Sequence, residues 1–402
     1  MKVPVVYTAA IAMMLQQALA TMSGLTVPVL APPISAETGL SASLVGVYTA
    51  FLYGGSMVSS LAGGGFLLRF GALRVSQACL LTVGLGLAIN MPGFIYLFIL
   101  GAVVIGLGGG PSTPASSQIL TRYATPSQAP LIFSIKQTGV PVGGVIAGVL
   151  LPFVAGEFGW RGAVLCAAAM AAALALALQP LRAEFDSDRQ PQRSLKLTDI
   201  RATLRTVLRD PRVRELAMGL FAFTGLQLAF ASFFVSYLTL GMSWALTDAG
   251  IAYSIAMGAG IAGRLFWGWV GSRYVPPVLL LAILGVTMGF ACMAVGLVAP
   301  DWTRPAVWAV AFVYGLTGIG YQGVLLAEIA RVSPPGMAGV VTGGAVFFAY
   351  AGMILFPASF GLVLALTDSY RPAFFVLGAV PILVGIMLYR SARRAGIRRA
   401  DR

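Results

Sequence analysis

Two cationic residues lie inside long apolar runs of this sequence, where charged side chains are rare. Lys136 falls about seven residues into the run 130–153, and Arg264 falls about six residues before the end of the run 247–270. At a helical rise of 1.5 Å per residue, each lies about 10 Å from the nearer end of its run. Ionisable residues at such a depth in a membrane are costly and usually functional. Because the arginine fork can bind both oxygens of a carboxylate, the two residues predict a site for a small anion.

Structural roles for the same two residues are also open. Lys136 is near enough to the end of its run for its ammonium group to reach the interface. Arg264 could instead donate to backbone carbonyls or reach Glu328. Glu328 itself stands three residues before Arg331, which is the spacing of a helical ion pair. The other acidic residues fall outside the apolar runs or toward their ends, so the sequence places no carboxylate beside the two cations.

The apolar runs indicate a polytopic membrane protein. Of the 402 residues, 58% are hydrophobic and 10% are charged, whereas about 25% of a soluble protein is charged. Runs of about twenty apolar residues have the length that crosses a bilayer. The net charge of +13 is concentrated in two short stretches, which argues against a nucleic-acid partner. The chain has no histidine and its three cysteines lie in apolar runs, so we expect no metal and no other cofactor.

Twelve spans are predicted, which makes this an all-α membrane protein with both termini on one side. If that side is the cytoplasm, it holds 21 of the 26 Lys and Arg residues, and the opposite side holds three. The positive-inside rule therefore predicts cytoplasmic termini, in a plasma (inner) membrane. The spans cover residues 5–31, 42–64, 75–91, 93–120, 130–153, 161–180, 214–239, 247–270, 276–299, 306–329, 338–363 and 372–390.

One long hydrophilic stretch divides the spans into two groups of six. We predict an N-terminal six-helix bundle at 1–180, a cytoplasmic linker at 181–213, and a C-terminal six-helix bundle with a basic cytoplasmic tail at 214–402. The linker contains a basic run from residue 201 that continues to 214. This run either lies against anionic lipid headgroups or only sets the topology.

The two halves of the chain repeat each other. Matching residues recur in chain order at offsets between 204 and 210. Near-constant offsets indicate two homologous parallel halves, an organisation typical of transporters whose halves rock about a central site. The matched pairs include Gln17 with Gln227, Gly64 with Gly268, Arg69 with Arg273, Gly106 with Gly315, Arg122 with Arg331, Pro126 with Pro335, and Ala129 with Ala338.

At these matches the sequence resembles the Major Facilitator Superfamily over nearly its whole length. The family signature Gly-x-x-x-Asp-Arg-x-Gly-Arg-Arg is similar to the stretch 64–74, but Leu68 replaces the aspartate, and Ser272 replaces it in the second half. The charge relay that relatives make there is therefore in question. The stretch 139–144 is similar to the family's antiporter motif, or is a kink with a small-residue packing face. We predict conformational or gating roles for Gly64, Arg69, Gly71, Arg74, Gly139, Pro141, Gly143, Gly144, Gly268, Arg273, Glu328 and Arg331.

The resemblance implies the major facilitator fold, in which two six-helix bundles are related by a pseudo-two-fold axis. It also implies that spans five and eight, which carry Lys136 and Arg264, border a central cavity. The stretch 260–268 around Arg264 is similar to the monocarboxylate and oxalate/formate branch of the family. Uncharged polar residues on other cavity-bordering spans complete the predicted site. The predicted substrate-binding residues are Arg264, Lys136, Gln17, Gln227, Gln322 and Tyr321.

These residues predict a secondary transporter that moves a small, monocarboxylate-like organic anion by alternating access. We expect a monomer with lipid around it and with a coupling proton or a counter-anion as a further partner. One alternative is an exporter of neutral or amphipathic compounds, in which both cations are structural. Another is a transporter-like sensor or a membrane-embedded enzyme, although no histidine, intramembrane acid pair or nucleotide-binding loop supports a reaction.

Overall fold

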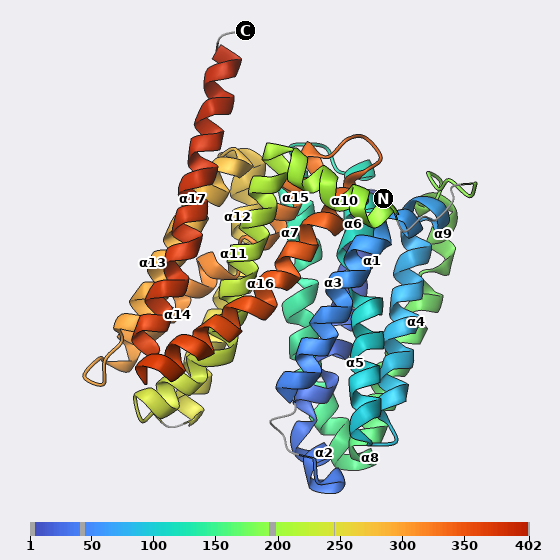
Figure 1. The fold of residues 1–402 in the computed structure, drawn as a ribbon. Helices are drawn as coiled ribbons and strands as arrows, with labels where there is room; N and C mark the ends of the chain where they lie inside the picture. The colour runs from blue at the N-terminus through green and yellow to red at the C-terminus, as the bar shows by residue number, and fades with distance from the viewer. Residues whose placement is uncertain (1–4, 41–44, 193–197, 245, 401–402) are drawn as a thin grey trace. The chain divides into compact units, whose positions relative to one another are not determined.

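The computed structural model describes residues 5–40, 45–192, 198–244 and 246–400, and every regular element in these ranges is a helix (Figure 1). Four residues that enter the count of basic side chains lie outside the described residues: Lys2, Arg193, Lys196 and Arg402. Within the described ranges, eleven helical stretches are long and apolar enough to cross a membrane.

One of these stretches is long enough for two crossings. Ala129–Phe185 has 57 residues, which is about 85 Å of helix, whereas a bilayer core is about 30 Å thick. Gly159 interrupts it with φ 71° and ψ 171°, a conformation that glycine adopts without steric cost. With this break the described chain has twelve crossings, and the predicted all-α protein with twelve spans is confirmed.

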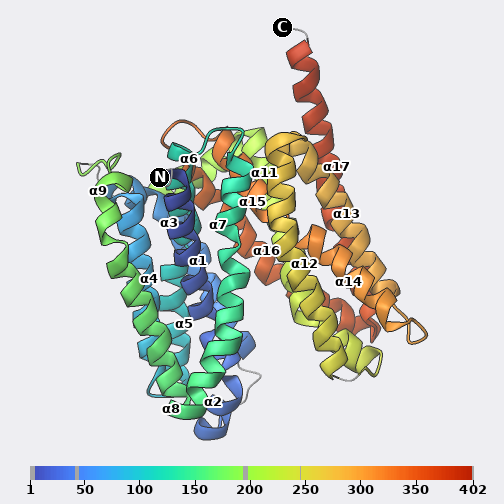
Figure 2. The same ribbon diagram turned by 180° about the vertical axis from the view of Figure 1, so that it is seen from behind.

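The helices of the first half run through the blue and green part of the ribbon (Figure 1). Figure 2 shows α8 from behind, and α8 packs against α1 and α4. The elements are α1 (Val5–Val29), α2 (Ala31–Thr38), α3 (Val45–Phe70), α4 (Ala72–Asn90), α5 (Ile95–Gly109), α6 (Ser112–Tyr123), α7 (Ala129–Gln137), α8 (Gly139–Ala177), the 3₁₀ turn η2 (Gln179–Leu181), α9 (Arg182–Phe185) and α10 (Thr198–Arg209).

The second half begins where Asp210 caps α11 by accepting hydrogen bonds from the N–H groups of Arg212 and Val213. Such a cap satisfies donors that have no partner inside the helix. The elements are α11 (Pro211–Ser236), the π-helical turn η3 (Tyr237–Gly241), α12 (Leu246–Arg273), α13 (Pro277–Leu297), α14 (Arg304–Gly318), α15 (Gln322–Val332), α16 (Ala338–Thr367) and α17 (Tyr370–Ala400).

Two of the predicted spans are broken at corresponding places. The span predicted at 93–120 is divided into α5 and α6 by residues 110–111. The span predicted at 306–329 is divided into α14 and α15 by residues 319–321. The breaks match at the repeat offset of 209, and the Ile319 carbonyl at the second break accepts a hydrogen bond from the Arg264 side chain. Irregular backbone at membrane depth is tolerated where it is buried in protein.

The chain forms two compact units, and each unit contains a short segment from the other half of the sequence. Unit 1 comprises residues 1–125, 135–209 and 333–347, and unit 2 comprises residues 126–134, 210–332 and 348–402. Helices α7 and α16 are therefore each shared between the two units. The division into 1–180, 181–213 and 214–402 stays a prediction.

Four glycines let helices approach closely within the units. A Cβ atom at Gly106 of α5 would overlap the Leu52 carbonyl of α3, and one at Gly315 of α14 would overlap the Ala256 carbonyl of α12. Gly143 meets α1 and Gly352 meets α11 in the same way. Each pair is separated by 209 residues, so the two halves repeat their helix packing as well as their sequence. Small residues at such contacts are typical of membrane helices.

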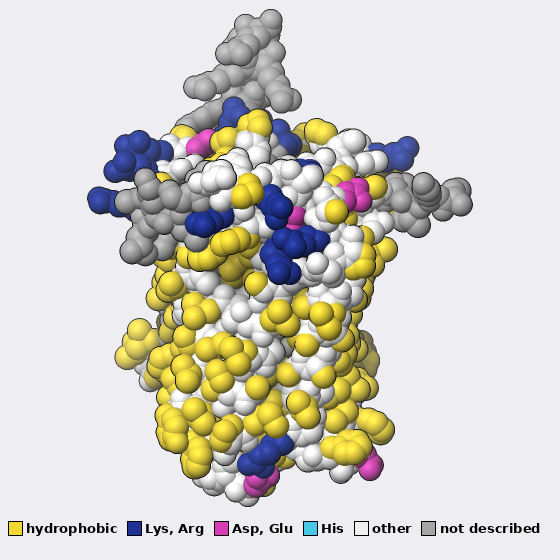
Figure 3. Space-filling model, turned by 90° about the vertical axis from the view of Figure 1, so that its right-hand side faces the viewer, with side chains coloured by type: hydrophobic (Ala, Val, Ile, Leu, Met, Phe, Trp, Pro, Cys, Tyr) yellow, Lys and Arg dark blue, Asp and Glu magenta, His cyan; other side chains and the backbone are white. Residues whose placement is uncertain are grey.

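Apolar side chains face outward around the middle of the helices. Val149, Phe153 and Leu176 of α8 are each at least 70% exposed. Figure 3 shows a wide apolar band, with most of the Lys and Arg side chains in view gathered beyond one end of it. An outer surface of this kind is compatible with lipid and not with water.

Candidate functional site

Lys136 lies near the end of α7, inside unit 1. Its side chain is buried at 1% exposure, and its Nζ donates hydrogen bonds to Gln17 Oε1 at 2.8 Å and Gln137 Oε1 at 2.9 Å. The ammonium group therefore does not extend to the interface, which was one structural role left open by the sequence. Buried charges need such hydrogen bonds because desolvation is costly.

Gln17 joins three helices at this cluster. It comes from α1, and its Oε1 accepts from Lys136 of α7 and from Thr113 Oγ1 of α6 at 3.3 Å. One residue earlier, Gln16 and Ser112 exchange hydrogen bonds of 2.6 and 2.8 Å. The break before α6 brings Ser112 and Thr113 to α1. The sequence predicted Lys136 and Gln17 as site residues, and the structure brings them together.

Arg264 lies on α12, inside unit 2. Its side chain is 1% exposed, its Nε donates to the Ile319 carbonyl oxygen at 3.2 Å, and its Nη2 donates to Gln322 Oε1 at 3.2 Å. Ile319 belongs to the break between α14 and α15, where backbone carbonyls leave the helical pattern. The predicted site residues Arg264 and Gln322 are therefore in contact. The structural alternative with a backbone carbonyl is also observed, so the arginine is held and oriented by its own unit.

Tyr321 and Thr224 continue this cluster toward α11. Their hydroxyl oxygens are 2.9 Å apart, and the Tyr321 ring meets Phe223 edge to face at 5.3 Å between centroids. Gln227 stands one helical turn after Thr224 on α11. Its Oε1 is shielded from solvent and has no hydrogen-bond partner in the described part of the chain. Arg264, Gln322 and Tyr321 form one cluster, and Gln227 lies one helical turn from the Thr224 end of it.

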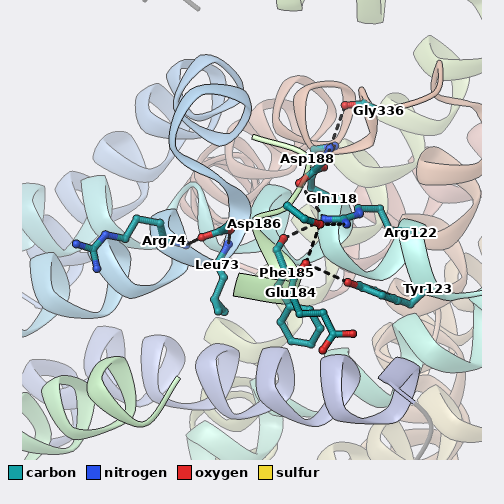
Figure 4. A network of polar contacts seen from close by, with 12 residues as sticks. Leu73, Arg74, Gln118, Arg122, Tyr123, Glu184, Phe185, Asp186, Asp188 and Gly336 are labelled. Atoms are coloured by element: carbon teal, nitrogen blue, oxygen red, sulfur yellow. Dashed lines mark hydrogen bonds and ion pairs between the residues drawn. The ribbon is translucent and has the colours of Figure 1, made fainter. Parts of the chain in front are cut away.

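A separate polar network at one end of unit 1 was not predicted by the sequence (Figure 4). Asp186, just after α9, accepts hydrogen bonds from the N–H groups of Leu73 at 2.7 Å and Arg74 at 3.1 Å, and so caps α4. Burial raises the pKa of Asp186, and the two N–H donors oppose that rise. Gly71, at φ 96°, leaves room for this carboxylate, because a Cβ there would overlap it.

The same network reaches the beginning of α16. Gln118 of α6 donates through Nε2 to the Gly336 carbonyl at 3.0 Å, and its Oε1 accepts from the Gly339 N–H at 2.9 Å. Its Nε2 also donates to Asp188 at 3.2 Å, and Asp188 pairs with Arg122 at 2.9 Å. Leu68, where the resembled signature has aspartate, is a buried apolar residue. The polar link from this end of unit 1 to the beginning of α16 is therefore made by Gln118 and not by residue 68.

The glycines predicted to gate lie at close helix contacts. A Cβ at Gly64 would lie 3.0 Å from Val340 at the start of α16, and one at Gly268 would lie 2.5 Å from Ser134 at the end of α7. Gly139 and Gly143 both lie against the α1 backbone, whereas Gly144 only touches Leu25. Pro141 lies between them without disrupting α8.

The charged residues predicted to gate have local partners. Arg331 donates to Glu328 Oε2 at 2.6 Å, and this is the helical ion pair that the spacing predicts. Arg69 stacks over Phe70 at 5.3 Å, and Arg74 donates to Gln77 Oε1 at 3.4 Å. Arg273 is an exposed residue of the last turn of α12. Among the described residues, no cluster of His, Cys, Asp or Glu could hold a metal ion.

Known proteins resemble this chain along most of its length. The sequence profile of the Major Facilitator Superfamily matches residues 12–357. The hexuronate transporter of Bacillus subtilis (strain 168) is 25% identical over 392 residues, which cover 90% of this chain and 89% of that protein. Monocarboxylate transporter 11 of Mus musculus is 27% identical over 360 residues, which cover 84% of this chain and 76% of that protein.

A solved structure gives the same fold. The human organic anion transporter MFSD10 is similar with a TM-score of 0.77 at 15% identity, and the match covers 96% of this chain and 100% of that one. At this identity the likeness shows the fold alone.

Proposed function

We propose a function from one premise, which is that this chain belongs to the Major Facilitator Superfamily. The family makes it an integral membrane transporter rather than an enzyme. The proposal is that it moves a small organic anion, monocarboxylate-like in its charged group, by alternating access. Its termini lie in the cytoplasm and its membrane is the plasma membrane, in accordance with the distribution of basic residues.

The observation that carries the substrate class is the position of Arg264. Its guanidinium is buried within a span and is oriented by the uncharged oxygens of Ile319 and Gln322. Both of these acceptors are uncharged and fix the direction of the fork, and a planar fork suits a carboxylate. In unit 1, Lys136 is held by two glutamine oxygens in the same way.

The substrates of two relatives support an anionic substrate for this chain. Hexuronates and monocarboxylates both carry a carboxylate, and the corresponding transporters align with most of this chain. The alternative, an exporter of neutral or amphipathic compounds, would make both cations structural. The Arg264 contact with a backbone carbonyl fits that alternative too, so a binding experiment has to separate them.

The experiment is a ligand screen by thermal unfolding of the detergent-purified protein. Acetate, propanoate, benzoate, succinate, glucose and tetraphenylphosphonium are compared on the wild type, Arg264→Ala, Arg264→Lys and Lys136→Met. A ligand at 100 times its Kd stabilises the native state by about 2.7 kcal/mol. Arg371→Ala is the matched control, because this exposed arginine lies at the start of α17, beyond the cluster.

We expect at least one carboxylate to stabilise the wild type and the Arg371→Ala control. Loss of a charge-assisted hydrogen bond costs about 1.5–3 kcal/mol, so Arg264→Ala and Lys136→Met each bind that carboxylate roughly 10- to 100-fold more weakly. Arg264→Lys retains a charge but not the fork, so its affinity should lie between those of the wild type and Arg264→Ala. If only glucose or tetraphenylphosphonium stabilises the protein, and does so equally in all variants, the anion-carrier proposal is wrong and the exporter is favoured.

A further inference from the structure

Gln227 differs from its counterpart in the first half of the chain in one chemical respect. Gln17 and Gln227 correspond at an offset of 210 residues. The Oε1 of Gln17 accepts hydrogen bonds from Lys136 and Thr113. The Oε1 of Gln227 is shielded from solvent and has no hydrogen-bond partner within the described residues. A shielded acceptor without a donor costs about 1–3 kcal/mol.

The repeat explains why the donor is missing. At the offset of 209 that aligns Ala129 with Ala338, Lys136 corresponds to Ala345, whose methyl group donates nothing. Thr113 corresponds to Gln322, whose Oε1 accepts from Arg264. Both side chains that occupy the Gln17 acceptor are thus replaced in the second half. The glutamine is thus present in both halves, whereas the two donors of the first half are absent from the second.

The neighbours of Gln227 on α11 place it beside the arginine cluster. One turn before it, Thr224 contacts Tyr321, and Tyr321 precedes Gln322 in the chain. One turn after it, the Phe230 ring stacks on Tyr314 of α14 at 3.9 Å between centroids. Residues spaced by three lie on one face of a helix, so this face of α11 is directed toward α14 and α15 within unit 2.

We infer that Gln227 Oε1 accepts a hydrogen bond from a hydroxyl group of the substrate, so that the transported anion is a hydroxycarboxylate. The inference rests on the proposed function, because the carboxylate of the same molecule is assigned to Arg264. A neutral hydroxyl fits this position better than an ammonium group, which the guanidinium in the same unit would repel. A buried acceptor discriminates against analogues that lack the donor, since they leave it unpaired.

The test uses pairs of carboxylates that differ by one hydroxyl group. Propanoate is compared with 2-hydroxypropanoate, and benzoate with 3-hydroxybenzoate, by isothermal titration on the purified full chain. We expect the wild type to prefer the hydroxylated member of at least one pair by roughly three- to tenfold, the value of one net hydrogen bond. Gln227→Leu should lose this preference while keeping its affinity for the unhydroxylated member.

Two further variants keep the result interpretable. Gln227→Glu retains an acceptor at the same position, so it should keep the hydroxyl preference while weakening both members of a pair through charge repulsion. Gln77→Leu is the matched control, because Gln77 is a buried glutamine of α4 that donates to the Ala175 carbonyl at 2.8 Å, in unit 1. It should leave the hydroxyl preference unchanged.

The possible results separate this inference from the proposed function. If carboxylates bind through Arg264 but neither pair shows a preference, or if the preference survives in Gln227→Leu, the hydroxycarboxylate assignment is wrong and the anion carrier stands. If no carboxylate binds at all, both are wrong. If Gln227→Leu does not fold, presence of the preference in both the wild type and Gln227→Glu supports the assignment, and its absence from the wild type contradicts it.

Discussion

At the scale of single residues, the two buried cations are held in the same chemical way. Lys136 donates to the amide oxygens of Gln17 and Gln137, and Arg264 donates to the amide oxygen of Gln322. A glutamine oxygen is a good acceptor that adds no charge, so it orients a cation and does not titrate. Each unit thus holds one buried cation through uncharged acceptors.

An ion pair outside the spans makes a pH-dependent contribution to stability. Glu37 of α2 accepts hydrogen bonds from Arg161 and, at 2.8 Å, from Trp160 Nε1. The hydrogen bond from Arg161, followed by that from Trp160, lowers the pKa of Glu37 below its ordinary value. The pair therefore stabilises the folded state at pH values above the ordinary glutamate pKa, and this contribution is lost as the pH falls through the lowered value.

We accordingly expect Glu37→Gln to melt at a lower temperature than the wild type at pH 7. The difference should shrink toward zero as the pH is brought to about 3. Because the pair is exposed, the effect is small and weakens further in high salt. Glu157→Gln, which changes an exposed glutamate on a different helix, α8, is the control. A difference that is the same at pH 7 and pH 3 would contradict this account.

At the scale of elements, the ends of helices are where side chains distant in sequence take over structural tasks. Asp186 caps α4 over a separation of 113 residues to Leu73, and Gln118 holds the first turn of α16 over a separation of 221 residues to Gly339. Helix ends expose unpaired N–H groups that must find acceptors. Asp186, just after α9, and Gln118 of α6 supply these acceptors.

Gly71 should tolerate no side chain. Its φ of 96° is strained for any other residue, and a Cβ would overlap the Asp186 carboxylate. We expect Gly71→Ala to lower the free energy of unfolding by about 2 kcal/mol or more. Thermal unfolding measures this, with Gly148→Ala of α8 as the control, because nothing lies within 4 Å of its Cβ position. An unchanged Gly71→Ala would show that Asp186 does not cap α4.

Gln118 should control how firmly the beginning of α16 is held. Gln118→Leu removes the acceptor for the Gly339 N–H and the donor for the Gly336 carbonyl. Two lost hydrogen bonds cost about 1–3 kcal/mol, so we expect amide hydrogen exchange at residues 338–341 to accelerate roughly 5- to 150-fold. The control Gln77→Leu should leave these amides unchanged. Equal exchange in Gln118→Leu and the wild type would assign the hold on α16 to other contacts, such as Gly64 against Val340.

At the scale of the whole molecule, the chain is a tandem repeat whose two units exchange short segments. Residues 126–134 belong to unit 2 and residues 333–347 belong to unit 1. The exchanged segments correspond to each other in the repeat, since each includes one of the matched prolines, Pro126 and Pro335. Each of α7 and α16 is therefore shared between units, which suits a family whose halves move during transport.

The proposed topology has a direct test at this scale. A reporter fused after Arg402 that is active only in the cytoplasm, such as a fluorescent protein that does not mature after export, should be active. A phosphatase that is active only outside should be silent at the same position. The positive-inside bias is the reason for this expectation. The opposite pattern would invert the orientation of every span.

Much of the fold could be predicted because it depends on local properties of the chain. Twelve apolar runs of membrane length, a hydrophilic linker and matching residues at near-constant offsets determine the number of helices and their division into two related halves. The breaks at residues 110–111 and 319–321 were missed. Apolar composition continues through both breaks, and hydropathy does not distinguish one helix from two that meet inside the membrane.

The sequence by itself determined which residues carry the chemistry, because Lys136 and Arg264 are the cations that its apolar runs contain. Only the tertiary structure decided what surrounds them: the Ile319 carbonyl that holds Arg264, and the Gln17 amide oxygen that holds Lys136. Backbone acceptors leave no trace in residue types, and contacts across 100 or more positions follow no local period. Those partners exist only once the helices have packed.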